Sequence, residues 1–153
     1  MRKQLSKSEI KEINLELEDN YGLQNFFSKK DNLIVEDILD YKVLKTNKVL
    51  FFEYEGRWVP ILKLILENNF LKKITVDTGA VKFVVNGADV MRPGITKVDE
   101  EIKENEIIVI VDETHSKPLA IGLTLFDSQG INEQKTGKSL VNLHQVGDKL
   151  WGL

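Results

Sequence analysis

Apolar residues near the start of the chain recur at the spacing of an α-helix. Ile10 and Leu17 stand seven residues apart, which places them on one helical face. Ser6 and Glu9 have the spacing of a capping box, in which each side chain accepts a hydrogen bond from a backbone N–H at the helix start. The sequence therefore predicts a helix that begins after Ser6 and ends near residues 20–22.

Beyond residue 30 the apolar residues gather in short runs bounded by turn-forming residues, a pattern typical of strands. Pro60 follows these runs and suits the first turn of a helix, because its missing N–H is not needed there. The helix that it opens would extend over 61–66, where most residues are apolar. The short, partly basic segment 70–73 is the best domain boundary. Strands are expected at 33–35, 42–44 and 49–54, with a turn at 46–48.

The second half of the chain has short apolar runs punctuated by glycine. A hairpin turn at Gly147-Asp148 would lead into a returning strand that includes Leu150 and Trp151. Several short strands at close spacing favour a small barrel or sandwich. The other strands are expected at 107–111, 119–126 and 140–143, with a polar connection at 127–137.

The segment from Val81 to Val85 fits two structures. Its β-branched and aromatic residues favour a strand. Its flanks favour a helix, because Asp77 or Thr78 can cap a helix start and Asn86-Gly87 can form a left-handed end. The pattern alone leaves this choice open.

Composition and charge limit the classes of function. The chain has 153 residues, no cysteine and a net charge of −3, so disulfides, thiol nucleophiles and cysteine zinc sites are excluded. Residues 1–73 carry 13 basic and 12 acidic side chains, whereas residues 74–153 carry 8 and 12. A nucleic-acid site would therefore be a local patch. No apolar run is long enough to span a bilayer and no secretory signal is evident, so we expect a cytoplasmic protein without membrane contact.

The candidate catalytic motifs are incomplete. Thr136-Gly137-Lys138-Ser139 is similar to the end of a phosphate-binding loop, but Asn132 stands where that motif needs glycine. His115 lies in a polar turn without a second histidine or a cysteine nearby, and the acidic run 99–106 is interleaved with lysines. His144 ends a strand, where it either packs in the interior or contacts a ligand. We expect no enzyme activity, no cofactor and no metal.

The segment from Val76 to Ile95, VDTGAVKFVVNGADVMRPGI, resembles the opening of a PUA domain, an RNA-binding module. Residues 118–125 and 137–151 resemble its later strands, and residues 50–65 resemble the malignant T-cell-amplified sequence and ligatin family, especially its archaeal stand-alone relatives. The resemblance implies an α+β fold. A small α/β pre-PUA-like domain, residues 1–73, would precede a PUA-like β-barrel with a short helix, residues 74–153.

In PUA domains, RNA lies against the first helix, the following turn and a late strand. Transferred by position, the resemblance implies a helix start that offers close approach, free N–H groups and charge to phosphate. The turn and the closing strand would line the rest of the surface. The implied RNA-binding residues are Gly79, Ala80, Lys82, Gly87, Ala88, Arg92, Pro93 and His144.

The resemblance further implies a non-catalytic protein that recognises structured RNA, such as tRNA or rRNA, in translation initiation or recycling on the small ribosomal subunit. Two alternatives stay open. One is a protein-interaction module whose N-terminal unit docks a translation factor. The other is an accessory subunit of an RNA-modifying enzyme.

Overall fold

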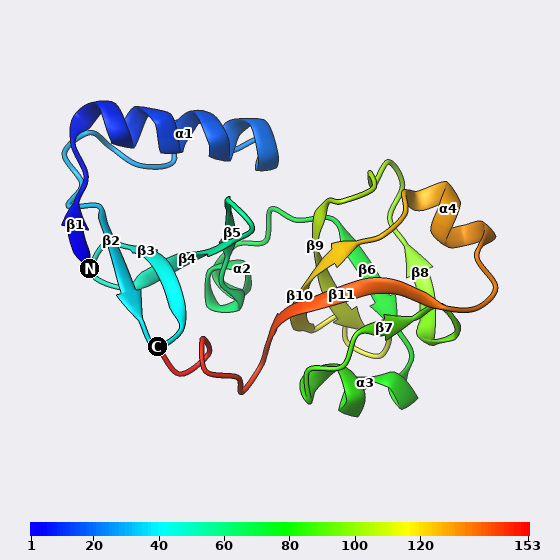
Figure 1. Ribbon diagram of the computed structural model, residues 1–153. Coiled ribbons are helices and arrows are strands. Elements are labelled where there is room, and N and C mark those ends of the chain that lie inside the picture. Colours follow the sequence, from blue (N-terminus) through cyan, green and yellow to red (C-terminus); the bar gives the residue numbers. More distant parts are fainter. The chain divides into compact units, whose positions relative to one another are not determined.

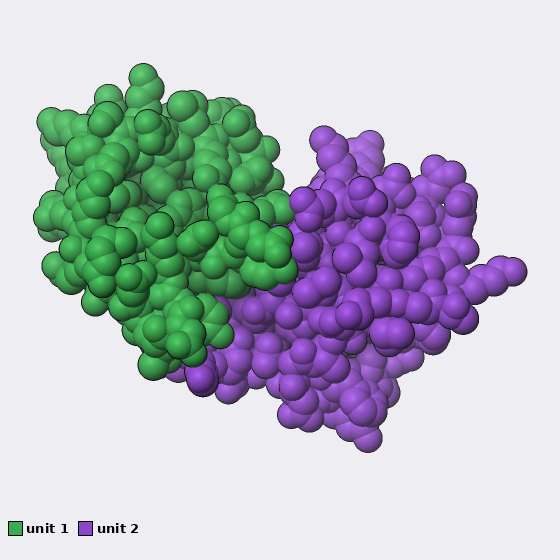
Figure 2. Space-filling model, viewed as in Figure 1, with its two compact units in different colours: residues 1–61 green, residues 62–153 purple.

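The computed structural model describes residues 1–153. The chain forms two compact units, residues 1–61 and residues 62–153 (Figures 1 and 2). Residues 62–73 belong to the second unit, and the domain boundary between residues 73 and 74 stays a prediction. The longest helix has 15 residues, and no helix combines the length and the hydrophobicity needed to cross a membrane.

The first unit begins with the predicted capped helix, α1 (Lys7–Tyr21). The Ser6 hydroxyl accepts a hydrogen bond from the Glu9 N–H at 3.2 Å, and the Glu9 carboxylate accepts one from the Ser6 N–H at 3.0 Å. Gly22 ends the helix in a left-handed conformation with φ of 70°. The predicted capping box and the predicted end of this helix are both confirmed.

An antiparallel sheet of five strands in sequential order completes this unit. Leu17 of α1 and Phe51 of the sheet are fully buried, and Phe27 packs edge-on against Phe51. Pro60 ends the fifth strand instead of opening a helix, so its predicted place at a helix start is wrong. The strands are β1 (Arg2–Gln4), β2 (Ile34–Ile38), β3 (Tyr41–Lys45), β4 (Val49–Tyr54) and β5 (Arg57–Pro60).

The second unit is a six-stranded mixed sheet that curls in the manner of a barrel around an aliphatic core (Figure 1). Neighbouring strands are antiparallel except β6 and β9, which are parallel. A short helix, α2 (Leu62–Glu67), precedes the sheet. In spatial order the strands are β7 (Val90–Met91), β11 (Lys138–Gln145), β10 (Pro118–Thr124), β9 (Ile107–Asp112), β6 (Lys73–Val76) and β8 (Ile95–Val98). The α+β fold class is confirmed.

Three helical segments connect these strands: α3 (Thr78–Val85), the 3₁₀ turn η1 (Arg92–Gly94) and α4 (Ser128–Glu133). The ambiguous segment is therefore helical. The polar connection contains the unpredicted α4, whose first turn is capped by the Asp127 carboxylate through the Gly130 N–H at 2.7 Å.

The predicted returning strand after Gly147 is wrong. The Asp148 carboxylate instead accepts hydrogen bonds from the backbone N–H groups of Gln145 and Trp151, at 3.0 and 2.9 Å. These bonds fold the end of the chain into turns.

Candidate nucleic-acid interface

The start of α3 is occupied by carboxylates of the protein itself. The Asp77 carboxylate caps the helix by accepting the Ala80 N–H at 2.8 Å. The Glu113 carboxylate accepts the Thr78 N–H at 3.0 Å and the Thr78 hydroxyl at 3.2 Å. The expectation that this helix start offers its N–H groups to phosphate is therefore wrong for Thr78 and Ala80. The Gly79 N–H donates to neither carboxylate.

Gly79 and Ala80 are both small, but Ala80 lies in a close contact between two elements and Gly79 does not. A Cβ on Gly94 would lie 3.3 Å from the Ala80 Cβ, so Ala80 and Gly94 are small because the helix and η1 approach closely. A Cβ on Gly79 would meet just the Asp77 carboxylate at 3.5 Å, an ordinary contact. The fold thus requires a small residue at Ala80 and imposes no such requirement at the exposed Gly79.

Lys82 and Phe83 are exposed on α3. The Lys82 ammonium lies over the Phe83 ring, 5.2 Å from its centroid, a cation–π arrangement. Phe83 was absent from the RNA-binding residues implied by the resemblance. The sequence signal for Phe83 is that apolar residues occupy more than one face of α3. A helix on the surface of a domain buries one face, so an apolar residue on another face is exposed.

The turn after α3 is held by the end of the helix. Gly87 has a left-handed φ of 93°, and the N–H groups of Gly87 and Ala88 donate to the Val84 and Phe83 carbonyls at 2.9 and 3.0 Å. Ala88 is exposed. The left-handed helix end predicted at Asn86-Gly87 is therefore confirmed, and the role of this turn in RNA binding stays a prediction.

Arg92 is partly buried and hydrogen-bonded to the backbone of its own unit. Its Nε donates to the Ile131 carbonyl at 2.7 Å, and its Nη1 donates to the Ile95 carbonyl at 3.0 Å. The guanidinium therefore joins α4 to the start of β8 through two of its donors, and its contact with RNA phosphate stays a prediction. The neighbouring Pro93 is exposed.

His144 is completely buried, so its predicted contact with RNA is wrong. Its Nε2 accepts the Leu62 N–H at 3.0 Å, and its Nδ1 lies 2.9 Å from the Asp148 carboxylate. Because an N–H faces Nε2, the ring proton is on Nδ1, where it donates to Asp148. The ring thus joins β11 to the start of α2 and to the last turns.

The stability of the fold is expected to decrease as the pH falls from 7.5 to 5.5. Burial lowers the pKa of His144, and the Asp148 carboxylate offsets this in part. The unfolded chain therefore takes up the proton first, as the pH falls below a pKa of about 6.5. The contribution of neutral His144 to the free energy of unfolding is complete above that pH and decreases below it. Denaturant unfolding across this range measures the effect. A His115→Gln variant should keep the dependence and a His144→Gln variant should lose most of it; equal dependence in both would contradict the assignment.

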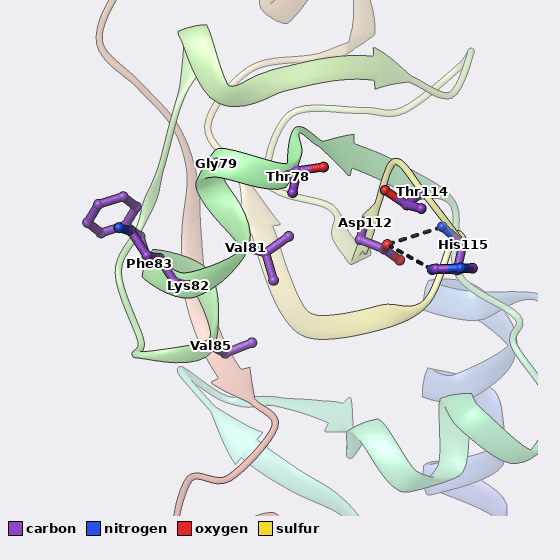
Figure 3. A pocket seen from close by; sticks show the side chains of 9 residues that line it. All are labelled: Thr78, Gly79, Val81, Lys82, Phe83, Val85, Asp112, Thr114 and His115. Atoms are coloured by element: carbon purple, nitrogen blue, oxygen red, sulfur yellow. Dashed lines mark hydrogen bonds and ion pairs between the residues drawn. The ribbon is translucent and has the colours of Figure 1, made fainter.

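A pocket of about 740 Å³ lies beside α3 (Figure 3). Val81 and Val85 line it from the helix, and His115, with a side chain 81% exposed, lines it from the loop after β9. The Asp112 carboxylate holds this loop by accepting the backbone N–H groups of Lys117 and His115, at 2.6 and 3.1 Å. The first of these bonds is the main reason why the pKa of Asp112 is lowered.

The relatives of the chain identify its family. The PUA domain model matches residues 72–146. Malignant T-cell-amplified sequence 1 of Danio rerio is 31% identical over 160 residues, which cover 97% of this chain and 88% of that protein. The chain belongs to the malignant T-cell-amplified sequence 1 family of PUA-domain proteins. An uncharacterized protein of Methanocaldococcus jannaschii is 39% identical over 150 residues, 96% of this chain and 93% of that relative.

Solved structures share the fold of this PUA-domain protein along its whole length. A hypothetical protein of Pyrococcus horikoshii has a TM-score of 0.84 at 30% identity, covering 99% of this chain and 98% of that one. A conserved PUA-domain protein of Thermoplasma acidophilum has a TM-score of 0.76 at 25% identity, with the same coverage of both chains.

The phosphate-loop-like segment of this PUA-domain protein has another role. Lys138 opens strand β11 and pairs with the Asp89 carboxylate at 2.8 Å. Ser139 is buried and donates to the Gln134 side chain at 2.6 Å. A strand follows where a nucleotide-binding loop needs a helix. No group of three or more histidine and carboxylate side chains is arranged to hold a metal ion.

Proposed function

We propose that this protein is a non-catalytic RNA-binding protein that recognises structured RNA, tRNA or rRNA, in translation on the small ribosomal subunit. Membership of the PUA-domain family is the observation that carries the proposal. Translation machinery-associated protein 20 of Schizosaccharomyces pombe supports the setting, since it is 31% identical over 121 residues, 76% of this chain and 67% of that protein.

The surface that we propose for RNA comprises the exposed side of α3 and the neighbouring turns. Lys82 supplies its positive charge, and the ammonium makes no ion pair with a carboxylate. Gly79, Ala88 and Pro93 leave the backbone accessible around it. Affinity is modest, because few phosphates can be neutralised in a half of the chain with an excess of acidic residues.

Charge reversal at Lys82 tests this surface. We expect Lys82→Glu to weaken tRNA binding about tenfold and to lower the slope of log affinity against log salt by about one, because one phosphate contact is lost. Fluorescence anisotropy at several salt concentrations measures both quantities. The same reversal at Lys97, exposed on β8 of the same unit, is the matched control and should have a smaller effect.

Charge reversal at Lys29 and Lys30 tests whether the first unit, and not α3, contacts the RNA. If these changes weaken binding more than Lys82→Glu, the first unit carries the RNA contact. If none of the variants alters binding to tRNA or to small-subunit particles, the RNA proposal fails and docking of a translation factor takes its place.

A further inference from the structure

Phe83 is an aromatic side chain that is exposed to solvent. It is 57% exposed, whereas Phe27, Phe51 and Phe52 are buried. An exposed phenylalanine forgoes most of the stabilisation that burial would give it. The ring projects outward from α3, with the Lys82 amino group beside it (Figure 3).

The packing of α3 does not need this ring. Val84 is buried at 2% exposure, and Val81 and Val85 pack against the same aliphatic core. These three valines anchor the helix on one side. Phe83 lies outside that contact, so a role in holding the helix does not account for its presence.

Gly79 stands one turn before Phe83, on the same helical side. Glycine destabilises a helix relative to alanine. Here it has no compensating structural reason, because its φ is not positive and a Cβ would be accommodated. The glycine leaves bare backbone next to the ring, because a side chain in a helix leans toward the preceding turn.

Lys82 gives the surface a positive charge. Its ammonium lies over the Phe83 ring and takes part in none of the ion pairs found between lysines and carboxylates. The Asp77 and Glu113 carboxylates accept hydrogen bonds from N–H groups in the first turn of the helix. An anionic ligand is therefore attracted to the Lys82 side of the helix.

We propose that Phe83 stacks an unpaired base of the bound RNA, while Lys82 contacts the phosphate of that nucleotide and Gly79 makes room for it. A flat base and an anionic phosphate match an exposed ring beside an unpaired ammonium. The proposal rests on the proposed RNA-binding function and adds that the RNA presents a single-stranded nucleotide to α3.

Two hairpin RNAs with the same stem test this, one blunt and one with a four-nucleotide single-stranded extension that carries 2-aminopurine. Phe83→Ala is expected to weaken binding of the extended hairpin about tenfold and to leave the blunt hairpin unchanged. Phe83→Trp should restore binding and quench the 2-aminopurine. Phe126→Ala, which truncates another exposed phenylalanine of the same unit, should change neither affinity.

Gly79→Ala provides an independent arm. The variant should fold with unchanged or higher thermal stability, since the added methyl group fits, yet bind the extended hairpin several-fold more weakly. If Phe83→Ala affects both hairpins equally or neither, stacking is overturned, while weakening of both by Lys82→Glu would still support the proposed function. If neither hairpin binds the unaltered protein, both proposals fail.

Discussion

Replacing His144 with alanine is expected to destabilise the fold by about 3–5 kcal/mol. The change leaves a cavity where the ring is completely buried. It also removes the acceptor of the Leu62 N–H and one donor to the Asp148 carboxylate, and unpaired buried polar groups are costly. Denaturant unfolding followed by circular dichroism measures the loss.

His115→Ala is the matched control, because its side chain is exposed and the expected change is below about 0.5 kcal/mol. His144→Gln should recover part of the loss, since its side-chain oxygen can accept an N–H hydrogen bond. A loss below about 1 kcal/mol for His144→Ala would show that these bonds add little net stability. Mild destabilisation together with strongly reduced RNA binding would instead indicate that His144 contacts the RNA.

Local signals in the sequence predicted the elements whose ends are fixed by nearby side chains. The box formed by Ser6 and Glu9 placed α1, and Asp77 caps α3 at one of the two positions that the flanks allowed. The apolar interior of α3 favoured a strand by propensity. Burial of Val84 against the sheet, a tertiary contact, stabilises the helix instead.

Two elements escaped prediction, one because it is short and has a partner distant in sequence, the other because its turn sequence fits more than one structure. α4 is six residues long and mostly polar, so it has almost no hydrophobic periodicity. Its backbone is held by Arg92, far away in sequence. The turns after β11 depend on the Asp148 carboxylate, whereas Gly147-Asp148 by itself has the sequence of a hairpin turn.

The implied RNA-binding residues fall into two groups, those that stabilise the fold and those that are exposed. A motif transferred by position contains residues of both kinds. Ala80, Arg92 and His144 contact the domain's own backbone or side chains. Lys82 is available to a partner, and a spacing pattern could not distinguish these two groups because it contains no information on burial or partners.

Arg92→Ala is expected to cost about 2–4 kcal/mol of stability, because two charge-assisted hydrogen bonds to the Ile131 and Ile95 carbonyls are lost together. Arg92→Lys should recover less than half of this, since an ammonium lacks the planar fork that donates along two fixed directions. Urea unfolding measures both, and Lys138→Met, which removes an exposed ion pair with Asp89, should cost less than about 1 kcal/mol.

Hydrogen exchange then shows which helices and strands Arg92→Ala destabilises. Because the Arg92 fork joins α4 to β8, amides of α4 should lose protection in Arg92→Ala while those of α3 keep it. Arg92→Glu should add repulsion between its carboxylate and the same two carbonyls, so it should unfold more readily than the alanine variant. Loss of RNA binding in Arg92→Glu would therefore report unfolding, unlike loss in Lys82→Glu. An Arg92→Glu protein that is as stable as the unaltered chain, and defective just in RNA binding, would show that the guanidinium leaves these carbonyls to contact phosphate.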